Sequence, residues 1–199
     1  MPDMPDMPDM PVMPDMPDMP DMPDMPDPSP ASAWSRAAAD PRVDAALRAI
    51  HREVAESTLA ARPLCVASGQ CCRFERFGHR LYVTGLETAW FLAGLEHDLQ
   101  RTLTVEDLDA AIAAGTCPFL REGLCSVHAI RPFACRTFFC DPRSSAWQTE
   151  LHERMHARVR ALHDEIGVEY RYAEWRAMLG EFVRAGRRTE ARGGEGIGK

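Results

Sequence analysis

Apolar residues recur at every third or fourth position in two long stretches of the chain, a spacing typical of amphipathic helices. The first stripe predicts a helix over residues 41–61, because Asp40 supplies an N-cap acceptor and a proline follows at the first helical position. The second stripe, over residues 147–166, predicts a long helix capped by Ser144 or Ser145. The two stripes indicate a mostly helical protein.

Three shorter elements follow from local signals. Thr84 and Glu87 have the spacing of a capping box, which predicts a helix over residues 85–95. The apolar residues 81–83 just before it are typical of a short extended segment. Near the C-terminus, inward-facing apolar positions predict a last helix over residues 174–183.

Between these elements the chain is irregular. Thr104 begins a weaker helix pattern, and Gly115 is a plausible end for it. Residues 121–124 indicate a turn between two short arms, which allows a short β-hairpin. The predicted fold class is therefore mostly α, with irregular cysteine-rich loops between the helices.

The first 27 residues are Met-Pro-Asp triplets with a single Met-Pro-Val variant, and they hold eight aspartates. A proline at every third position prevents helices and sheet ladders, so residues 1–30 are predicted to be a disordered tail. Without those eight aspartates the formal net charge of −7 becomes −7 + 8 = +1. A single domain is expected over residues 31–186, followed by a disordered tail over 187–199.

Composition excludes several classes of function. The domain has no long basic stripe for nucleic acid, and the chain has no apolar run of the roughly 18 residues that a membrane span needs. The sequence also lacks a secretory signal, so a reducing cytoplasm is the expected compartment. There, clustered cysteines more often bind metal or do redox work than form disulfides.

Seven cysteines fall into two clusters beside glycines, prolines and turns, which is unlike the single buried cysteines of ordinary cores. Thiolates on short loops can converge on zinc, on iron or on an iron–sulfur cluster. The predicted metal ligands are Cys65, Cys71, Cys72, Cys117, Cys125, Cys135 and Cys140. His128 is an eighth candidate donor, and the sequence leaves open whether one or two sites form. Arg73, Arg131 and Arg136 are candidate counter-charges for the thiolates.

The cysteine pattern is similar to that of the YkgJ-like cysteine-cluster family, over roughly residues 64–140. The matching pieces are Cys65-x2-Ser68-x2-Cys71-Cys72, Cys117-Pro-Phe-Leu, Cys125-x2-His128, Arg131-Pro and Cys135-Arg136. This resemblance implies chelation of zinc or iron and no defined reaction. The chain departs from the family where it has Ser68 in place of a cysteine and His128 in place of an aromatic residue.

A literal His-Glu-x-x-His motif, from His152 to His156, suggests a zinc hydrolase as a further alternative. Two observations favour an ordinary solvated helix face instead. Arg154 and Arg158 place full charges in and beside the motif, and no third ligand follows at a familiar spacing.

The function expected from the sequence is a cytoplasmic protein that chelates zinc or iron, as a single ion or as an iron–sulfur cluster. The main alternative is a metal- or cluster-dependent enzyme that performs redox chemistry or modifies a protein substrate. A third hypothesis is a scaffold whose metal shapes a surface for a protein partner. The metal ion is the only firm partner, and neither nucleic acid nor membrane is expected.

Overall fold

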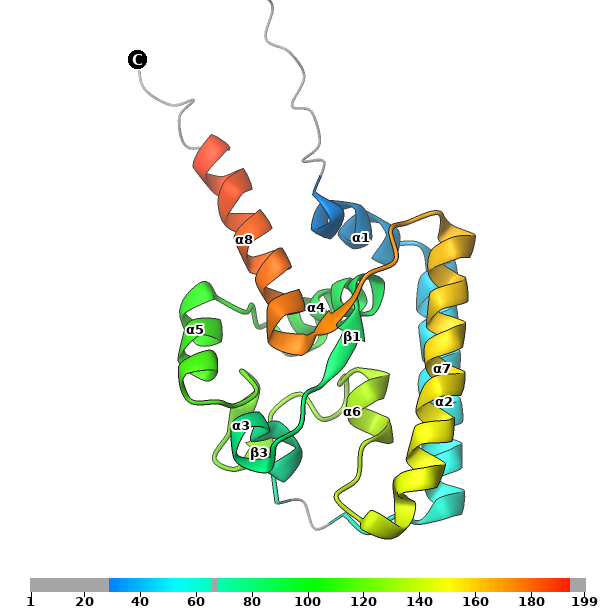
Figure 1. Ribbon diagram of the computed structural model, residues 1–199. Helices are drawn as coiled ribbons and strands as arrows, with labels where there is room; N and C mark the ends of the chain where they lie inside the picture. Colours follow the sequence, from blue (N-terminus) through cyan, green and yellow to red (C-terminus); the bar gives the residue numbers. More distant parts are fainter. Residues whose placement is uncertain (1–28, 66–67, 194–199) are drawn as a thin grey trace, which may run out of the picture.

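A computed structural model describes residues 29–65 and 68–193 (Figure 1). The Met-Pro-Asp repeat and residues 194–199 lie outside the described residues, so the predictions for the two ends stay predictions there. The described chain is mostly helical with two small antiparallel sheets, which confirms the predicted fold class. None of the described helices combines the length and the apolar character that a bilayer span requires.

The α-helices are α1 (Pro30–Ala38), α2 (Pro41–Ala61), α3 (Phe74–Phe77), α4 (Gly85–Leu99), α5 (Val105–Ala113), α6 (Phe133–Thr137), α7 (Ser145–Ile166) and α8 (Trp175–Gly193). Two 3₁₀ turns are η1 (Gln70–Cys72) and η2 (Pro142–Ser144). The strands are β1 (Tyr82–Thr84), β2 (Leu120–Arg121), β3 (Leu124–Cys125) and β4 (Tyr172–Glu174).

Two groups of helices build the molecule (Figure 1). The long helices α2 and α7 pack side by side, and α6 packs against both. In the second group α1 packs on α4, and α8 contacts α1, α4 and α5. The region that carries the cysteines lies at the end of the molecule opposite α1 (Figure 1).

The caps explain why the predicted helix starts are correct. The Asp40 side chain accepts a hydrogen bond from the backbone N–H of Arg42, and α2 begins at Pro41. Thr84 accepts from the N–H of Glu87 at 3.3 Å, and α4 begins at Gly85. Gly167, in the left-handed conformation, ends α7.

Some elements differ from the prediction. Helix α1 was not predicted, although Ser29 and Pro30 repeat the cap-and-proline signal of α2. Helix α8 begins at Trp175 and runs to Gly193, beyond the predicted end near residue 183. Glu174, the predicted start of that helix, belongs to strand β4 instead.

Strand β4 pairs with the extended segment that the sequence does predict. Val83 of β1 faces Ala173 of β4 in an antiparallel register. The N–H of Trp175 then donates to the carbonyl of Leu81 at 2.8 Å, so the start of α8 is fixed to β1. The predicted turn at 121–124 joins β2 and β3 in a two-stranded hairpin, which confirms that part of the prediction.

An aromatic core connects the helices to the cysteine region. Trp34, Phe91 and Trp175 are buried at 0–1% exposure. The Phe91 ring meets Trp175 at a centroid distance of 5.2 Å and Phe119 at 5.1 Å, both edge-on. Phe119 lies only two residues after Cys117, so the packing of its ring in this core fixes the position of the start of the second cysteine cluster.

Candidate metal centre

The two cysteine clusters, far apart in the sequence, lie against each other. The backbone N–H of Cys117 donates to the carbonyl of Cys72 at 2.8 Å. Nearby, the N–H of Glu75 donates to the carbonyl of Gly115 at 3.1 Å. These bonds attach the segment after the first cluster to the segment that begins the second.

Close packing of two glycines makes a further contact between the clusters. Gly69 is buried and has a φ of +66°, a conformation that favours glycine. A Cβ atom at this position would lie 2.1 Å from the carbonyl oxygen of Gly123, in the turn between β2 and β3. The first loop therefore reaches the hairpin only because residue 69 has no side chain.

The side chain of Cys72 is the point at which the thiols meet. Side-chain hydrogen bonding with Cys117, Cys125 and Cys71, together with burial, raises the pKa of Cys72 far above its ordinary value. The same contact with Cys72 is the largest cause that lowers the pKa of Cys71 to about 7 and that of Cys125 to about 6. Cys72 therefore keeps its proton, while its neighbours Cys71 and Cys125 ionise more readily than ordinary thiols.

Cys135 joins this group from helix α6. Burial raises the pKa of its thiol well above the ordinary value, and the nearby Cys117 and Cys125 raise it further. The position of α6 is fixed by Glu87, which is fully buried. A carboxylate oxygen of Glu87 accepts from the N–H of Phe133, the first residue of α6, at 2.6 Å. The five sulfurs of Cys71, Cys72, Cys117, Cys125 and Cys135 form what we call the thiol group.

One of the three candidate arginines lies beside several thiols. The positive charge of Arg131 contributes to lowering the pKa of Cys71 and Cys125 and opposes the rise at Cys135. The Arg136 guanidinium instead donates to the backbone carbonyls of Arg131 and Ala129. Nothing in the described contacts brings the Arg73 guanidinium to a thiol.

The remaining predicted donors lie further out. Cys65 and Cys140 are exposed, and so are the side chains of His128 and Ser68. Burial raises the pKa of Cys140, and the nearby Cys71 and Cys65 raise it further. The backbone N–H of Leu64 donates to the carboxylate of Asp141 at 3.3 Å, and this bond joins the chain beside Cys65 to the chain beside Cys140.

All seven cysteines are free thiols. Within residues 29–65 and 68–193, however, no set of three or more His, Cys, Asp or Glu side chains is arranged as a metal-ion site. The described contacts instead run from sulfur to sulfur through Cys72. The chemistry of the donor set fits a soft metal, whereas its arrangement is that of sulfurs hydrogen-bonded to one another around Cys72.

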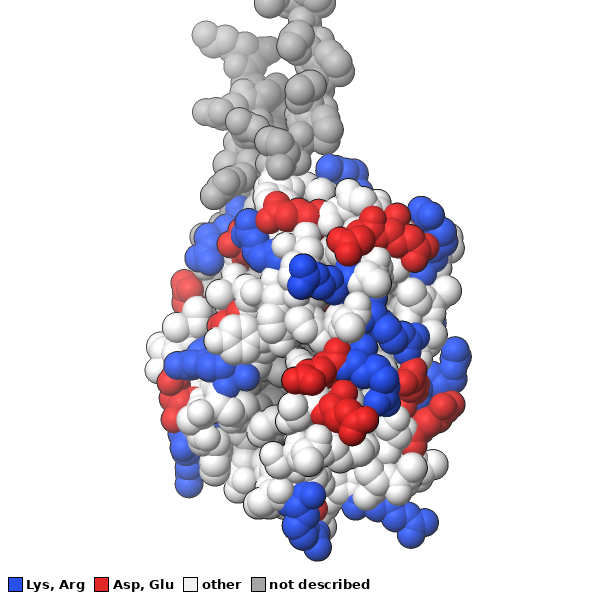
Figure 2. Space-filling view, turned by 45° about the vertical axis from the view of Figure 1, so that its right-hand side comes forward, with Lys and Arg blue, Asp and Glu red and all other residues white. Residues whose placement is uncertain are grey.

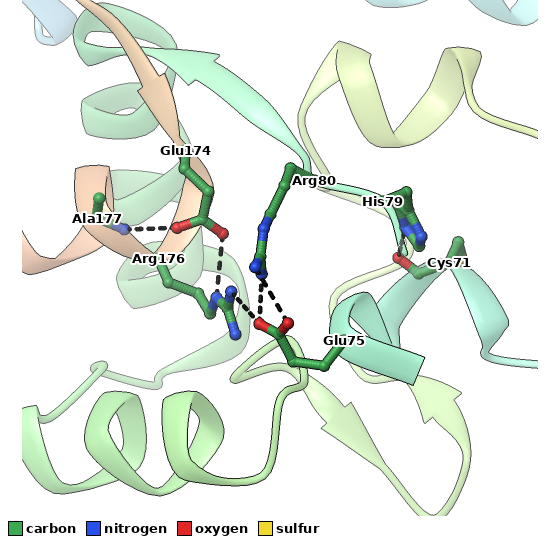
Figure 3. Close-up of polar contacts among 7 residues, drawn as sticks. All are labelled: Cys71, Glu75, His79, Arg80, Glu174, Arg176 and Ala177. Atoms are coloured by element: carbon green, nitrogen blue, oxygen red, sulfur yellow. Dashed lines mark hydrogen bonds and ion pairs between the residues drawn. The ribbon is translucent and has the colours of Figure 1, made fainter. Parts of the chain in front are cut away.

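Hydrogen bonds and stacked rings hold the backbone of the first cluster in place. The Nε2–H of His79 donates to the carbonyl of Cys71 at 3.1 Å (Figure 3). The His79 ring is stacked on Phe138 with a centroid distance of 4.7 Å. In the same view, Glu75 of α3 binds Arg80 and Arg176, so an ion network joins this region to α8 (Figure 3).

The His-Glu-x-x-His motif lies on α7, and both histidines bond to tyrosines. The Nε2 atom of His152 is 3.1 Å from the hydroxyl of Tyr172, and its Nδ1 is 3.3 Å from the hydroxyl of Thr137. The Nε2 atom of His156 is 2.6 Å from the hydroxyl of Tyr170. Burial lowers the pKa of both histidines. These bonds occupy both ring nitrogens of His152 and the Nε2 atom of His156, and they give the hydrolase alternative no support.

A cavity of about 590 Å³ opens beside the thiol group. Its walls include six of the seven cysteines, all except Cys65, together with Arg131. Other lining residues come from β1, β4 and the first half of α7, with Tyr82, Tyr172 and His152 among them. The thiols therefore face a space large enough for a small molecule.

Comparisons with protein-family models, with curated proteins and with solved structures found no match. The resemblance to the YkgJ-like family therefore stays a prediction from the cysteine spacing.

Sequence reasoning missed several residues of this site. The local spacing marks Glu87 as a capping residue, but its carboxylate bonds to Phe133 instead of closing the box. Tyr172 and Trp175 reach the cavity wall through the β1–β4 pairing, which no local pattern announces. The apolar pattern of the last helix does predict that Trp175 faces inward, and its side chain is buried at 1% exposure; its place beside the cysteines was not predicted.

Proposed function

We propose that this chain is a metal-binding protein whose thiol group holds zinc or an iron centre, either a single ion or an iron–sulfur cluster. The observation that carries the proposal is the contact of Cys72 with both Cys117 and Cys125, because it unites cysteines from the two clusters. Free cysteines seldom gather in this way without a soft metal as partner. The YkgJ-like resemblance implies the same chemistry.

The ligands we assign are the five members of the thiol group, with Arg131 as the nearby counter-charge. Metal binding requires thiolates, so Cys72 must lose the proton that it now shares with its neighbours. The metal would then take the place of this proton. Cys65 and Cys140, being exposed, are assigned outside this set.

Elemental analysis of protein purified without oxygen tests the proposal. We expect at least one equivalent of zinc or iron per chain, with visible absorption if the iron is in a cluster. Protein that contains neither metal, and takes up neither zinc nor iron with sulfide under reducing conditions, would contradict the proposal.

Two serine variants distinguish a specific metal site from nonspecific metal binding by exposed thiols. Cys72→Ser removes the central sulfur and should abolish stoichiometric metal binding. Cys140→Ser removes an exposed sulfur and should leave the metal content unchanged. Equal loss in the two variants would show that the thiol group has no special role.

A metal-dependent enzyme is the second candidate, and the cavity favours it. A metal that only stabilises the fold needs no adjoining space, whereas here the thiols line about 590 Å³. Exchange kinetics separate the two roles. A metal that chelators remove only when the protein unfolds indicates a structural site, and one that exchanges in the folded protein indicates an open site.

A further inference from the structure

Two of the seven cysteines stand apart from the proposed metal ligands. Cys65 and Cys140 are exposed, whereas each member of the thiol group is half-buried or buried. Cys65 follows α2, which ends at Ala61, and Cys140 precedes α7, which begins at Ser145. Because α2 and α7 pack side by side, with these two helix ends at the same end of the molecule, the two connections start from neighbouring places (Figure 1).

A buried carboxylate holds the two connections together. Asp141, the residue after Cys140, is only 8% exposed. Its Oδ2 atom accepts from the backbone N–H of Leu64, the residue before Cys65, at 3.3 Å. The carboxylate also accepts from the backbone N–H of Arg143 at 3.1 Å and pairs with the Arg143 guanidinium at 3.0 Å. Asp141 is therefore fixed within its own segment while it holds the segment of Cys65.

The thiol of Cys140 also responds to its neighbours. Burial raises the pKa of Cys140, and the nearby Cys71 and Cys65 raise it further. Cys71 is already hydrogen-bonded to Cys72 within the thiol group, which leaves Cys65 as the exposed neighbour of Cys140. Neither Cys65 nor Cys140 belongs to a helix or a strand, so both segments can make the small adjustments that disulfide geometry requires.

We propose that Cys65 and Cys140 form a site of thiol–disulfide exchange, which a small disulfide such as oxidised glutathione converts into an internal disulfide. One cysteine thiolate attacks a sulfur of the small disulfide, forms a mixed disulfide and releases the first glutathione. The other cysteine thiolate then attacks the protein sulfur of the mixed disulfide, and the second glutathione leaves. The two cysteines lose two electrons and two protons, and the small disulfide gains them as two glutathione thiols.

The site is open to a small reagent. Cys140 and Asp141 line the cavity. Figure 2, with the side that carries α2 and α7 turned forward, shows a hollow bordered mainly by uncharged atoms. Exposed disulfides are the labile and regulatory kind, whereas structural ones resist reduction. The internal disulfide is therefore a reversible link at one wall of the cavity.

This exchange site does not depend on metal binding, because neither cysteine belongs to the thiol group. The test treats the full chain, purified without oxygen and freed of reductant, with oxidised glutathione. Iodoacetamide then blocks the remaining thiols, and tandem mass spectrometry of the peptides locates the link. We expect a link between Cys65 and Cys140 as the main product, with unchanged metal content. Dithiothreitol should restore both thiols.

Serine variants separate the two steps of the exchange. Cys65→Ser and Cys140→Ser each leave one exposed cysteine, which should stop at the mixed disulfide and keep one glutathione. No internal link should form in either variant. An internal link in either serine variant would show that another thiol is the partner.

The carboxylate that joins the segments has its own test. Asp141→Ala releases Leu64, so the mixed disulfide should accumulate and the second glutathione should leave roughly tenfold more slowly. Asp141→Asn keeps an oxygen that can accept from Leu64 and should recover most of the rate. Asp164→Ala is the control, because Asp164 is exposed in the last turn of α7 and forms no hydrogen bond or ion pair with any described residue. It should react as the parent protein does.

Three outcomes would overturn the assignment: a link from Cys140 to Cys71 instead of Cys65, mixed disulfides that never resolve into a link, or no reaction at either exposed cysteine. An Asp141→Ala variant that reacts as fast as the parent would contradict the role of the carboxylate. Metal content is measured in parallel. Formation of the Cys65–Cys140 link with loss of the metal would support the exchange site and contradict the assignment of the metal ligands.

Discussion

Glu87 connects helix α4 to the start of α6 through a hydrogen bond of its side chain. Its carboxylate is fully buried and accepts from the N–H of Phe133 at 2.6 Å, and the Nε2 atom of His51 lies 3.9 Å away. Since Cys135 follows Phe133 by two residues, this bond also orients part of the thiol group. A buried N–H that loses such an acceptor remains unpaired, which costs stability.

We therefore expect Glu87→Ala to reduce the free energy of unfolding by about 1.5–3 kcal/mol. Glu87→Gln keeps an oxygen that can accept from the N–H of Phe133, so its free energy of unfolding should fall clearly less than that of the alanine variant. Urea unfolding followed by circular dichroism measures both changes. A glutamine variant as unstable as the alanine variant would show that the contact with Phe133 is not what matters.

The sequence marks Glu87 correctly as a helix-start residue, since Thr84 does cap its N–H. The hydrogen bond between the Glu87 carboxylate and Phe133 could not be predicted, because the two residues are 46 positions apart in the sequence. The same holds for the cysteines, whose spacing could be used for prediction but whose burial could not be foreseen. Spacing predicts that thiols gather, but only the folded chain distinguishes the partly or fully buried thiol group from the exposed Cys65 and Cys140.

At the scale of elements, Gly69 decides whether the first cysteine loop can pack on the β2–β3 hairpin. Gly69→Ala would place a methyl group 2.1 Å from the carbonyl oxygen of Gly123 and would also strain a φ of +66°. Gly78 provides a matched control, because its φ is +65° and a Cβ there meets nothing within 4 Å. Both substitutions place alanine in the left-handed conformation, but only the one at Gly69 also brings a methyl group against neighbouring atoms.

We expect Gly78→Ala to cost about 1–2 kcal/mol from left-handed strain alone. Gly69→Ala should cost more and should also lower the metal content, because the two clusters are pushed apart. Thermal unfolding and elemental analysis of both variants give the comparison. Equal stability and equal metal content would mean that the packing of the two glycines is unimportant.

Long helices were predictable because each carries its own signals. The stripes and caps of α2 and α7 lie within the helices themselves, and both helices begin and end close to the predicted residues. Strand β4 could not be found in this way, since it is three residues long and pairs with β1 across some ninety positions of sequence. Short strands with distant partners carry too little local pattern to be recognised.

At the scale of the whole molecule, the helices and the thiol group depend on different forces. The helices share an apolar core in which the large side chains, among them Trp34, Leu47 and Phe91, are not ligands of the proposed set. Cys72 and Cys117 belong to this core, and the other three thiols pack against it. The thiol group lies at one end and is joined to the core through Phe119, Phe133 and the Cys72–Cys117 backbone bond. Removal of a bound metal should therefore destabilise the end of the molecule that carries the thiol group without unfolding the helices.

A chelator applied with a reductant under anaerobic conditions tests this separation. If the metal is present at about a hundred times its dissociation constant, its loss costs about 2.7 kcal/mol, which corresponds to a fall of roughly 5–10 °C in the unfolding midpoint for a chain of this size. The helical signal in circular dichroism at 20 °C should remain nearly constant, because the apolar core stays buried. Complete loss of that signal would mean that the metal organises the whole fold. An unchanged midpoint in protein shown to have lost its metal would mean that the thiols and their ligand contribute nothing to stability.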